Sequence, residues 1–277
     1  MSDVAAIAQA ARAWLAWHEE NGTEGLPTPR IAKASTLAPT PASSLTRSST
    51  ASTIASESPS FDTVPAPRSA AAPAPPPPPR VVIPARPLEV VQAEVQSCVK
   101  CVLASTRTST VFSRGNPAAR VAFVGEAPGA EEDAQGIPFV GKAGQLLDKM
   151  IGAMGLSPES DVYVCNIIKC RPPGNRRPEP EEIATCIPYL HEQLANVTPE
   201  VIVAMGNTAV QALLDTTLGI TKMRGAWKLY RGNVPVMPTY HPSYLLRPGP
   251  TQQEAKRHAW EDLQQVMKKL GLAVPKK

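Results

Sequence analysis

Aromatic residues are scarce in this chain, at 5% of 277 residues, and the region from residue 26 to 97 contains a single one, Phe61. The same region holds about half of the 31 prolines, in stretches such as STLAPTPASSLTRSSTASTIASESPS and APAPPPPPR. A segment of this composition cannot bury enough apolar surface to offset the entropy that it would lose on ordering. We therefore expect residues 26–87 to form a disordered linker, with a folded domain over residues 88–277.

Long apolar runs and a basic leader are also missing. No stretch approaches the roughly 18 consecutive apolar residues of a transmembrane helix, so we expect no contact with a membrane. The N-terminus has no basic segment ahead of an apolar one, and Arg12, His18 and Glu19 interrupt its apolar residues, which argues against a secretion signal. We expect a cytoplasmic protein.

Residues 1–25 predict one helix ahead of the linker. Apolar and amphipathic side chains recur at helical spacing from Val4 to His18, Ser2 or Asp3 can cap the start, and Gly22 can end it. Two interpretations stay open. The helix docks back on the main domain, or it binds a separate protein partner from the end of a tether.

The basic charge is concentrated in the predicted folded domain. Residues 1–97 carry 7 Lys and Arg against 8 Asp and Glu, whereas residues 98–277 carry 21 against 16, within a net charge of +4. A modest basic surplus suits an anionic partner such as nucleic acid.

Four runs rich in β-branched residues predict strands, and they alternate with segments of helical pattern. The runs are 120–126, 161–169, 200–206 and 233–241; the helical patterns are 142–154, 179–196, 207–215 and 251–271. This alternation predicts an α/β fold, a three-layer α/β/α sandwich with a central four-stranded parallel sheet. Each run ends in polar, Gly-rich or Pro-rich residues, and such loops converge on one cleft at the carboxyl ends of parallel strands.

Four of the five cysteines have spacings typical of a metal site. Cys98 and Cys101 form a C-x-x-C pair, and fifteen residues separate Cys170 from Cys186. Four thiolates suit a tetrahedral zinc ion or an iron–sulfur cluster, and the spacing alone does not separate the two. Cys165 lies within an apolar run, and we interpret it as a core residue.

Three motifs, in order, resemble those of the family 4 uracil-DNA glycosylases. They are GEAPGAEEDAQGIPFVGKAGQLL, NIIKCRPPGNRRP and HPSYLLR, with the four cysteines in the C-x2-C…C-x15-C frame between and ahead of them. The resemblance implies a uracil-DNA glycosylase-like catalytic domain over residues 88–277 and a [4Fe–4S] cluster on Cys98, Cys101, Cys170 and Cys186. It also implies a monomer that acts on uracil in single- or double-stranded DNA. Ala127 departs from other branches of that superfamily, which carry Asp or Asn there.

Removal of uracil from DNA requires flipping the nucleotide into a pocket and breaking the bond from N1 of the base to C1′ of the sugar. A carboxylate can stabilise the cationic sugar and orient a water, and the candidates are Glu126, Glu132 and Asp133. We favour Glu126, with Glu132 as second choice. His241 can donate a hydrogen bond to uracil O2, where negative charge gathers.

Phe139 can stack on the base, and the Asn166 amide can read N3–H and O4. The turn residues Gly125, Ala127 and Pro128 can cradle the base or a phosphate.

A further set of residues is expected to contact the DNA itself. Arginine side chains near the two later motifs can bind phosphates, and apolar side chains of HPSYLLR can fill the gap that the flipped base leaves. These DNA-contact candidates are Arg171, Arg176, Arg177, Tyr244, Leu245 and Arg247.

Two alternative functions stay open. The first is a non-catalytic iron–sulfur protein that binds nucleic acid and senses flipped bases. The second is a nucleotide-binding α/β protein, but GEAPG follows the first strand where dinucleotide-binding folds have G-x-G-x-x-G.

Overall fold

The computed structural model describes residues 86–275, so the predicted N-terminal helix and the predicted linker up to residue 85 lie outside the described residues. Four parallel strands form the centre of the sheet, as predicted. Their order is β3-β2-β4-β6, with bounds β2 Val121–Gly125, β3 Val162–Asn166, β4 Val201–Met205 and β6 Val234–Thr239. All side chains of β2, β3 and β4 are buried, because helices cover both faces of the sheet.

The predicted strand number was too small, because the described sheet has six strands. β1 (Ser113–Gly115) pairs antiparallel with β3 at one edge, and β5 (Lys228–Tyr230) pairs antiparallel with β6 at the other. Each edge strand has only three residues, which is too short for a pattern of alternating polar and apolar side chains to emerge.

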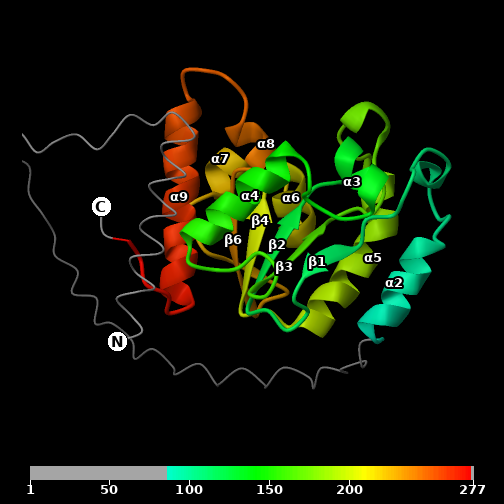
Figure 1. The fold of residues 1–277 in the computed structure, drawn as a ribbon, viewed down its shortest axis with the longest axis horizontal. Coiled ribbons are helices and arrows are strands. Elements are labelled where there is room, and N and C mark those ends of the chain that lie inside the picture. The colour runs from blue at the N-terminus through cyan, green and yellow to red at the C-terminus, as the bar shows by residue number, and fades with distance from the viewer. Residues whose placement is uncertain (1–85, 276–277) are drawn as a thin grey trace, which may run out of the picture. The chain divides into compact units, whose positions relative to one another are not determined.

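Helices lie on both faces of the sheet, which gives the predicted three layers (Figure 1). One face packs against α4 (Lys142–Ala153), α8 (Pro242–Leu245) and α9 (Gln252–Lys269). The other packs against α5 (Pro180–Val197), α6 (Asn207–Leu214) and α7 (Ile220–Met223). Successive residues of β2 alternate between the two cores, with Phe123 in the first and Ala122 and Val124 in the second.

Short elements connect this framework to the loops. α2 (Leu88–Gln96) contacts α5, and the pair lies at the opposite side of Figure 1 from α9. The 3₁₀ turn η1 (Val102–Ser105) follows the C-x-x-C pair, α3 (Ala130–Gln135) follows β2, and the 3₁₀ turn η2 (Pro173–Asn175) follows β3. None of the described helices has the length and apolar character needed to cross a lipid bilayer.

A buried ion pair joins the end of β6 to the helices around it. Asp262 of α9 is fully buried, and it accepts hydrogen bonds from the Thr239 hydroxyl at 2.8 Å and from Arg224 Nη2 at 2.7 Å. Arg224 follows α7, so one carboxylate ties α9, α7 and β6 together. Because Thr239 lies two residues before His241, this contact also fixes the base of the HPSYLLR loop.

We expect Asp262→Ala to lower the free energy of unfolding by about 3–5 kcal/mol, since Thr239 would lose this partner and the Arg224 guanidinium would keep only the His258 carbonyl as an acceptor. Chemical denaturation of the full chain measures this. Glu261→Ala is the matched control, because Glu261 contacts Arg257 at 3.5 Å on the exposed side of α9, where an ion pair contributes about 0–1 kcal/mol. Equal losses in the two variants would contradict the expectation.

Candidate active site

The polar ends of β2, β3, β4 and β6 meet at one cleft of about 660 Å³, as predicted for the carboxyl ends of parallel strands. The first predicted motif contributes Glu126, Ala127, Pro128, Glu132 and Phe139 to its walls. Asn166 comes from the end of β3, and His241, Tyr244 and Arg247 come from the loop after β6. Residues more than a hundred positions apart in the sequence therefore share one surface.

Gly125 lets two of the predicted base-binding side chains come together. A Cβ atom at this position would lie 2.5 Å from Asn166 Oδ1 and 2.5 Å from Phe139 Cζ, which is closer than atoms pack. Gly125 therefore lies between Asn166 and Phe139, and because it has no side chain, both can approach its backbone closely.

Asn166 carries a buried acceptor that has no partner. Its residue is 1% exposed, and among the described residues nothing donates a hydrogen bond to Oδ1. A buried polar atom left unpaired costs roughly 1–3 kcal/mol. Such an atom on the wall of a cleft is suited to a ligand that brings its own N–H donor.

Phe139 is held in a strained conformation at the opposite side of Gly125. Its φ angle is +56°, in the left-handed region that side chains larger than Gly rarely occupy. The loop is fixed by its approach to α4, because a Cβ atom at Gly144 would lie 1.8 Å from the Phe139 carbonyl oxygen. The Phe139 ring is 5.7 Å from the His241 ring, centroid to centroid, so the two rings border the same space. Phe139 is 5% exposed and also belongs to the core.

Glu132, the second choice for the catalytic carboxylate, holds the loop together. Its Oε1 accepts hydrogen bonds from the backbone N–H groups of Val140 at 3.0 Å and Gly141 at 2.9 Å, and its Oε2 accepts one from Gly129 at 3.0 Å. The neighbouring Asp133 accepts from the N–H groups of Thr108 and Ser109. These two acidic residues position backbone, so the geometry argues against Glu132 as the group that handles a water.

Glu126 differs from both of these acids. It is half-buried on the cleft wall, and its carboxylate has no hydrogen-bond or ion-pair partner among the described residues. Its backbone oxygen accepts from Ile168 N–H at 3.2 Å, which fixes the main chain while leaving the side chain available. Glu126 is therefore available for chemistry at the end of β2, whereas Glu131, which also lines the cleft, lies on the exposed start of α3.

His241 is held as one tautomer of the neutral ring. The backbone N–H of Ser243 donates to Nδ1 at 3.2 Å, and the Ser243 hydroxyl lies 2.8 Å from the same nitrogen. Because Nδ1 accepts, the proton of the neutral ring is on Nε2, which leaves a donor for the cleft. Burial lowers the pKa of His241 to about 4, Glu132 opposes this shift, and Arg247 adds to it. Ser243 is a positioning residue that the sequence analysis passed over, although it lies within the HPS motif.

We expect the His241 imidazole to stay neutral as the pH falls from about 8 to about 5, and to take up a proton only near pH 4. The lowered pKa has this sign because burial disfavours the charged ring. NMR of the ¹⁵N-labelled histidine side chains measures it, and His241→Asn identifies the signal by its loss. A midpoint near the ordinary value of about 6.5 would contradict the expectation.

The predicted DNA-contact residues divide into several groups. Arg247 lines the cleft and stacks on the Tyr244 ring at 5.9 Å. Arg176 also lines it, but its guanidinium donates to both oxygens of the buried Glu182 at 2.6 and 2.9 Å. Arg171 donates a hydrogen bond to Asn175, and Arg177 donates one to Gln211. Neither arginine lines the cleft.

The prediction for Leu245 was wrong. Its side chain is 0% exposed and lies in the core with α4 and α9, so it cannot reach DNA. The next residue, Leu246, is 43% exposed. Because α8 is a single short turn, adjacent residues point in different directions, and the motif by itself does not tell which leucine faces outward.

The four predicted ligand cysteines line one small cavity between η1, α5 and the end of β3, although Cys98 and Cys186 lie 88 positions apart. Arg107 Nη1 donates to Cys170 Sγ at 3.2 Å, and Lys169 N–H donates to Cys186 Sγ at 3.3 Å. Burial raises the pKa of the Cys170 thiol and raises that of Cys186 to about 11. In the described part of the chain, no group of three or more His, Cys, Asp or Glu side chains has the arrangement of a metal-ion site.

Cys165 is 0% exposed in the second core, as predicted.

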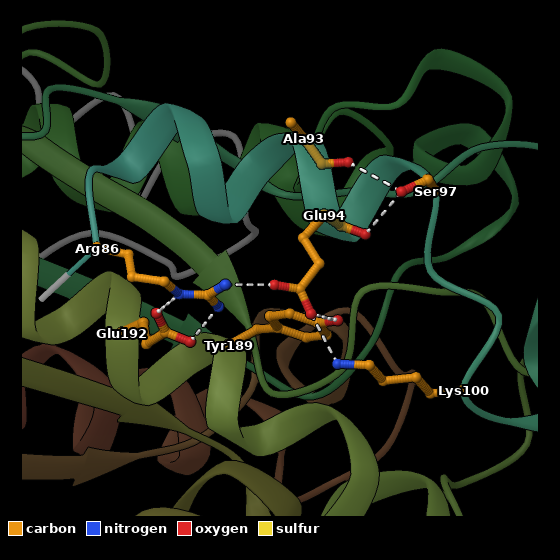
Figure 2. Close-up of polar contacts among 7 residues, drawn as sticks. All are labelled: Arg86, Ala93, Glu94, Ser97, Lys100, Tyr189 and Glu192. Atoms are coloured by element: carbon orange, nitrogen blue, oxygen red, sulfur yellow. Dashed lines mark hydrogen bonds and ion pairs between the residues drawn. The ribbon is translucent and has the colours of Figure 1, made fainter.

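A polar network attaches the C-x-x-C segment to α5 (Figure 2). The Glu94 carboxylate accepts hydrogen bonds from Lys100 Nζ at 2.7 Å, from Arg86 Nη1 at 2.6 Å and from the Tyr189 hydroxyl at 2.9 Å. Hydrogen bonds from Lys100 first, and then from Arg86 and Tyr189, lower the pKa of Glu94 to about 2. Lys100 lies between Cys98 and Cys101, so the network positions both cysteines against the helix that carries Cys186.

Comparison with known proteins gives one family. Residues 112–264 match the Uracil DNA glycosylase superfamily. The chain is 45% identical to a Type-4 uracil-DNA glycosylase of Thermotoga maritima over 180 residues, which cover 65% of this chain and 92% of that protein. It is 43% identical to one of Sulfurisphaera tokodaii over 57% of this chain and 76% of that protein. It is 39% identical to one of Saccharolobus solfataricus over 66% of this chain and 87% of that protein.

Proposed function

The chain belongs to the uracil DNA glycosylase superfamily, and on that premise we propose that it hydrolyses the bond between uracil and deoxyribose in DNA, as a repair enzyme that leaves an abasic site. The observation that carries the proposal is the buried, unpartnered Oδ1 of Asn166 on the wall of the cleft. Three groups suited to the same reaction, Glu126, Phe139 and His241, line that cleft with it.

Base recognition follows from the chemistry of the Asn166 amide. Uracil offers an N3–H donor and an O4 acceptor, which match the amide Oδ1 and the amide N–H. Cytosine offers an acceptor at N3 and a donor at C4, so both contacts would be mispaired. Phe139 supplies a face for stacking, and base–aromatic stacking is worth roughly 1–3 kcal/mol.

Bond cleavage develops negative charge on the leaving base and positive charge on the sugar. The Nε2–H of His241 donates to uracil O2, where the negative charge gathers, and a neutral ring can do so without giving up its proton. Glu126 stabilises the cationic sugar and orients the water that attacks C1′. Gly125, Ala127 and Pro128 let the backbone approach the base.

The four cysteines around the shared cavity fit an iron–sulfur cluster of the [4Fe–4S] type. The donor set supports this assignment, because four thiols surround one space and two of them accept N–H hydrogen bonds of the kind that stabilise cluster sulfurs. Cys98, Cys101, Cys170 and Cys186 would hold the cluster. When bound, the cluster would cross-link the segment before η1 to α5 and to the loop after β3.

DNA would lie across the mouth of the cleft. Arg247, Tyr244 and the exposed Leu246 of the last motif, together with Lys142 at the start of α4, are the side chains best placed to contact it. Arg176 supports the loop after β3 through Glu182, and we propose a supporting role for it in place of direct phosphate contact. The monomeric state, the role of residues 1–85 and a protein partner for them stay predictions.

The first experiment is excision from an end-labelled single-stranded oligonucleotide that contains one uracil, followed by alkali, with EDTA present and a thymine oligonucleotide as control. Strand breakage at uracil alone is the expected result. Binding to the uracil oligonucleotide without any strand breakage would overturn the assignment of glycosylase activity. It would favour a non-catalytic protein that senses flipped bases.

A further inference from the structure

Lys169 has a buried amine that the proposed reaction does not use, and burial lowers the pKa of this amine. Its residue is 1% exposed, and its Nζ donates a hydrogen bond to the backbone carbonyl oxygen of Asn166 at 2.6 Å. The lysine therefore restrains the backbone of the residue that we propose reads the base.

The same lysine lies against the cysteine cavity. Lys169 is among the residues that line that cavity, its backbone N–H donates to Cys186 Sγ at 3.3 Å, and Cys170 follows it in the chain. Its carbonyl accepts from Val111 N–H at 2.8 Å. The backbone of Lys169 is thus fixed at the cysteine cavity, and its side chain reaches back three residues to the carbonyl of Asn166.

The backbone at Asn166 decides where its amide points. Asn166 Oδ1 has no partner that would orient it, so the amide depends on the main chain and on the close approach of Gly125. The flanking backbone is held by Ile167 N–H, which donates to the Gly125 carbonyl at 2.9 Å. Loss of the bond from Lys169 would leave a buried carbonyl less well satisfied and freer to turn.

A lysine at this position suits the cavity that it borders. A buried ammonium is costly unless negative charge lies nearby, and four thiolates of a bound cluster would supply that charge. Five consecutive residues, 166–170, join the cysteine cavity to the base-reading amide, and Lys169 contacts both ends, Cys186 through its backbone N–H and Asn166 through its Nζ.

We propose that Lys169 is a positioning residue for uracil recognition, which holds the Asn166 amide in place from the wall of the cysteine cavity. The proposal rests on the proposed function, since it assigns to Asn166 the reading of the base. It extends that function by making base recognition depend on a residue outside the cleft.

The test is equilibrium binding of the full, iron-loaded chain to a single-stranded oligonucleotide with one 2′-fluoro-2′-deoxyuridine, whose fluorine disfavours the cationic sugar and so slows cleavage. The same oligonucleotide with thymidine measures general DNA binding, and iron per chain is measured for each variant. Lys169→Met removes the donor and keeps the length. Lys169→Gln keeps a neutral N–H. Lys268→Met is the matched control, because Lys268 is exposed in α9 and lines neither the cleft nor the cysteine cavity.

We expect Lys169→Met to bind the uracil analogue about ten- to a hundredfold more weakly, with thymidine binding and iron content unchanged. Lys169→Gln should lose less, and Lys268→Met should bind as the wild type does. Unchanged binding of the analogue by Lys169→Met, or equal weakening for both oligonucleotides, would overturn the proposal. Loss of iron from both Lys169 variants would also overturn it, because the side chain would then serve the cysteines. A wild-type chain without preference for the analogue would overturn the proposed function itself, and this proposal with it.

Discussion

Glu126→Gln is expected to lower the single-turnover rate of uracil excision by about 10²–10⁴-fold, the range that a positioned acid or base contributes. Glutamine keeps the size of the side chain but cannot stabilise a cationic sugar or accept a proton from water. Binding of uracil-containing DNA should stay close to that of the wild type, since Glu126 has no partner among the described residues whose loss would disturb the fold. Rapid-mixing excision assays with enzyme in excess measure the rate.

Glu131→Gln is the control for this variant, because Glu131 lines the same cleft from the exposed start of α3. It should excise uracil at nearly the wild-type rate. If Glu126→Gln retained full activity while Glu132→Gln lost it without loss of stability, the catalytic carboxylate would be Glu132. The three backbone donors around Glu132 argue against that result, since its replacement should loosen the loop from Gly129 to Gly141.

Asn166→Asp is expected to lower uracil excision by about 10²-fold, because the hydrogen bond from the amide N–H to uracil O4 is lost and two buried acceptors then face each other, at a cost of roughly 1–3 kcal/mol and more for a charged group. The carboxyl group cannot donate to uracil O4, whereas it can accept from the amino group of cytosine. The preference for uracil over cytosine should therefore shrink, and parallel assays on the two oligonucleotides measure it.

Asn175→Asp provides the comparison. Asn175 also lines the cleft, and its Oδ1 accepts from Arg171 Nε at 2.7 Å, a bond that an aspartate would keep. The base preference of this variant should match that of the wild type. A base preference that is unchanged in Asn166→Asp would show that another group reads the edge of the base.

The sequence predicted the framework of the domain well. The four runs of β-branched residues correspond to β2, β3, β4 and β6, because a strand covered on both faces needs apolar side chains throughout. The polar turns after these runs meet in one cleft, because parallel strands end at the same edge of the sheet. The edge strands β1 and β5 were missed, since three residues carry too little periodicity.

Roles within the cleft were harder to assign from the sequence. The acid-rich loop offers several carboxylates in a row, and their different roles depend on which backbone N–H groups fold back to meet them. Glu132 meets three such groups and Glu126 meets none. Likewise Leu245 is buried and Leu246 exposed because of the orientation of one short turn, which adjacent letters in a motif do not encode.

The sequence by itself determined the α/β class, the family motifs and the positions of the polar turns after the strands. It also determined which four cysteines lie together around one cavity. Each of these follows from local pattern and spacing. Only the tertiary structure decided that Asn166 keeps an unpartnered acceptor, that Ser243 fixes the His241 tautomer, and that Lys169 connects the two sites. Each of these properties depends on which polar atoms come into contact and which are left without a partner. Those contacts form between segments that are distant in the sequence, so they exist only in the folded chain.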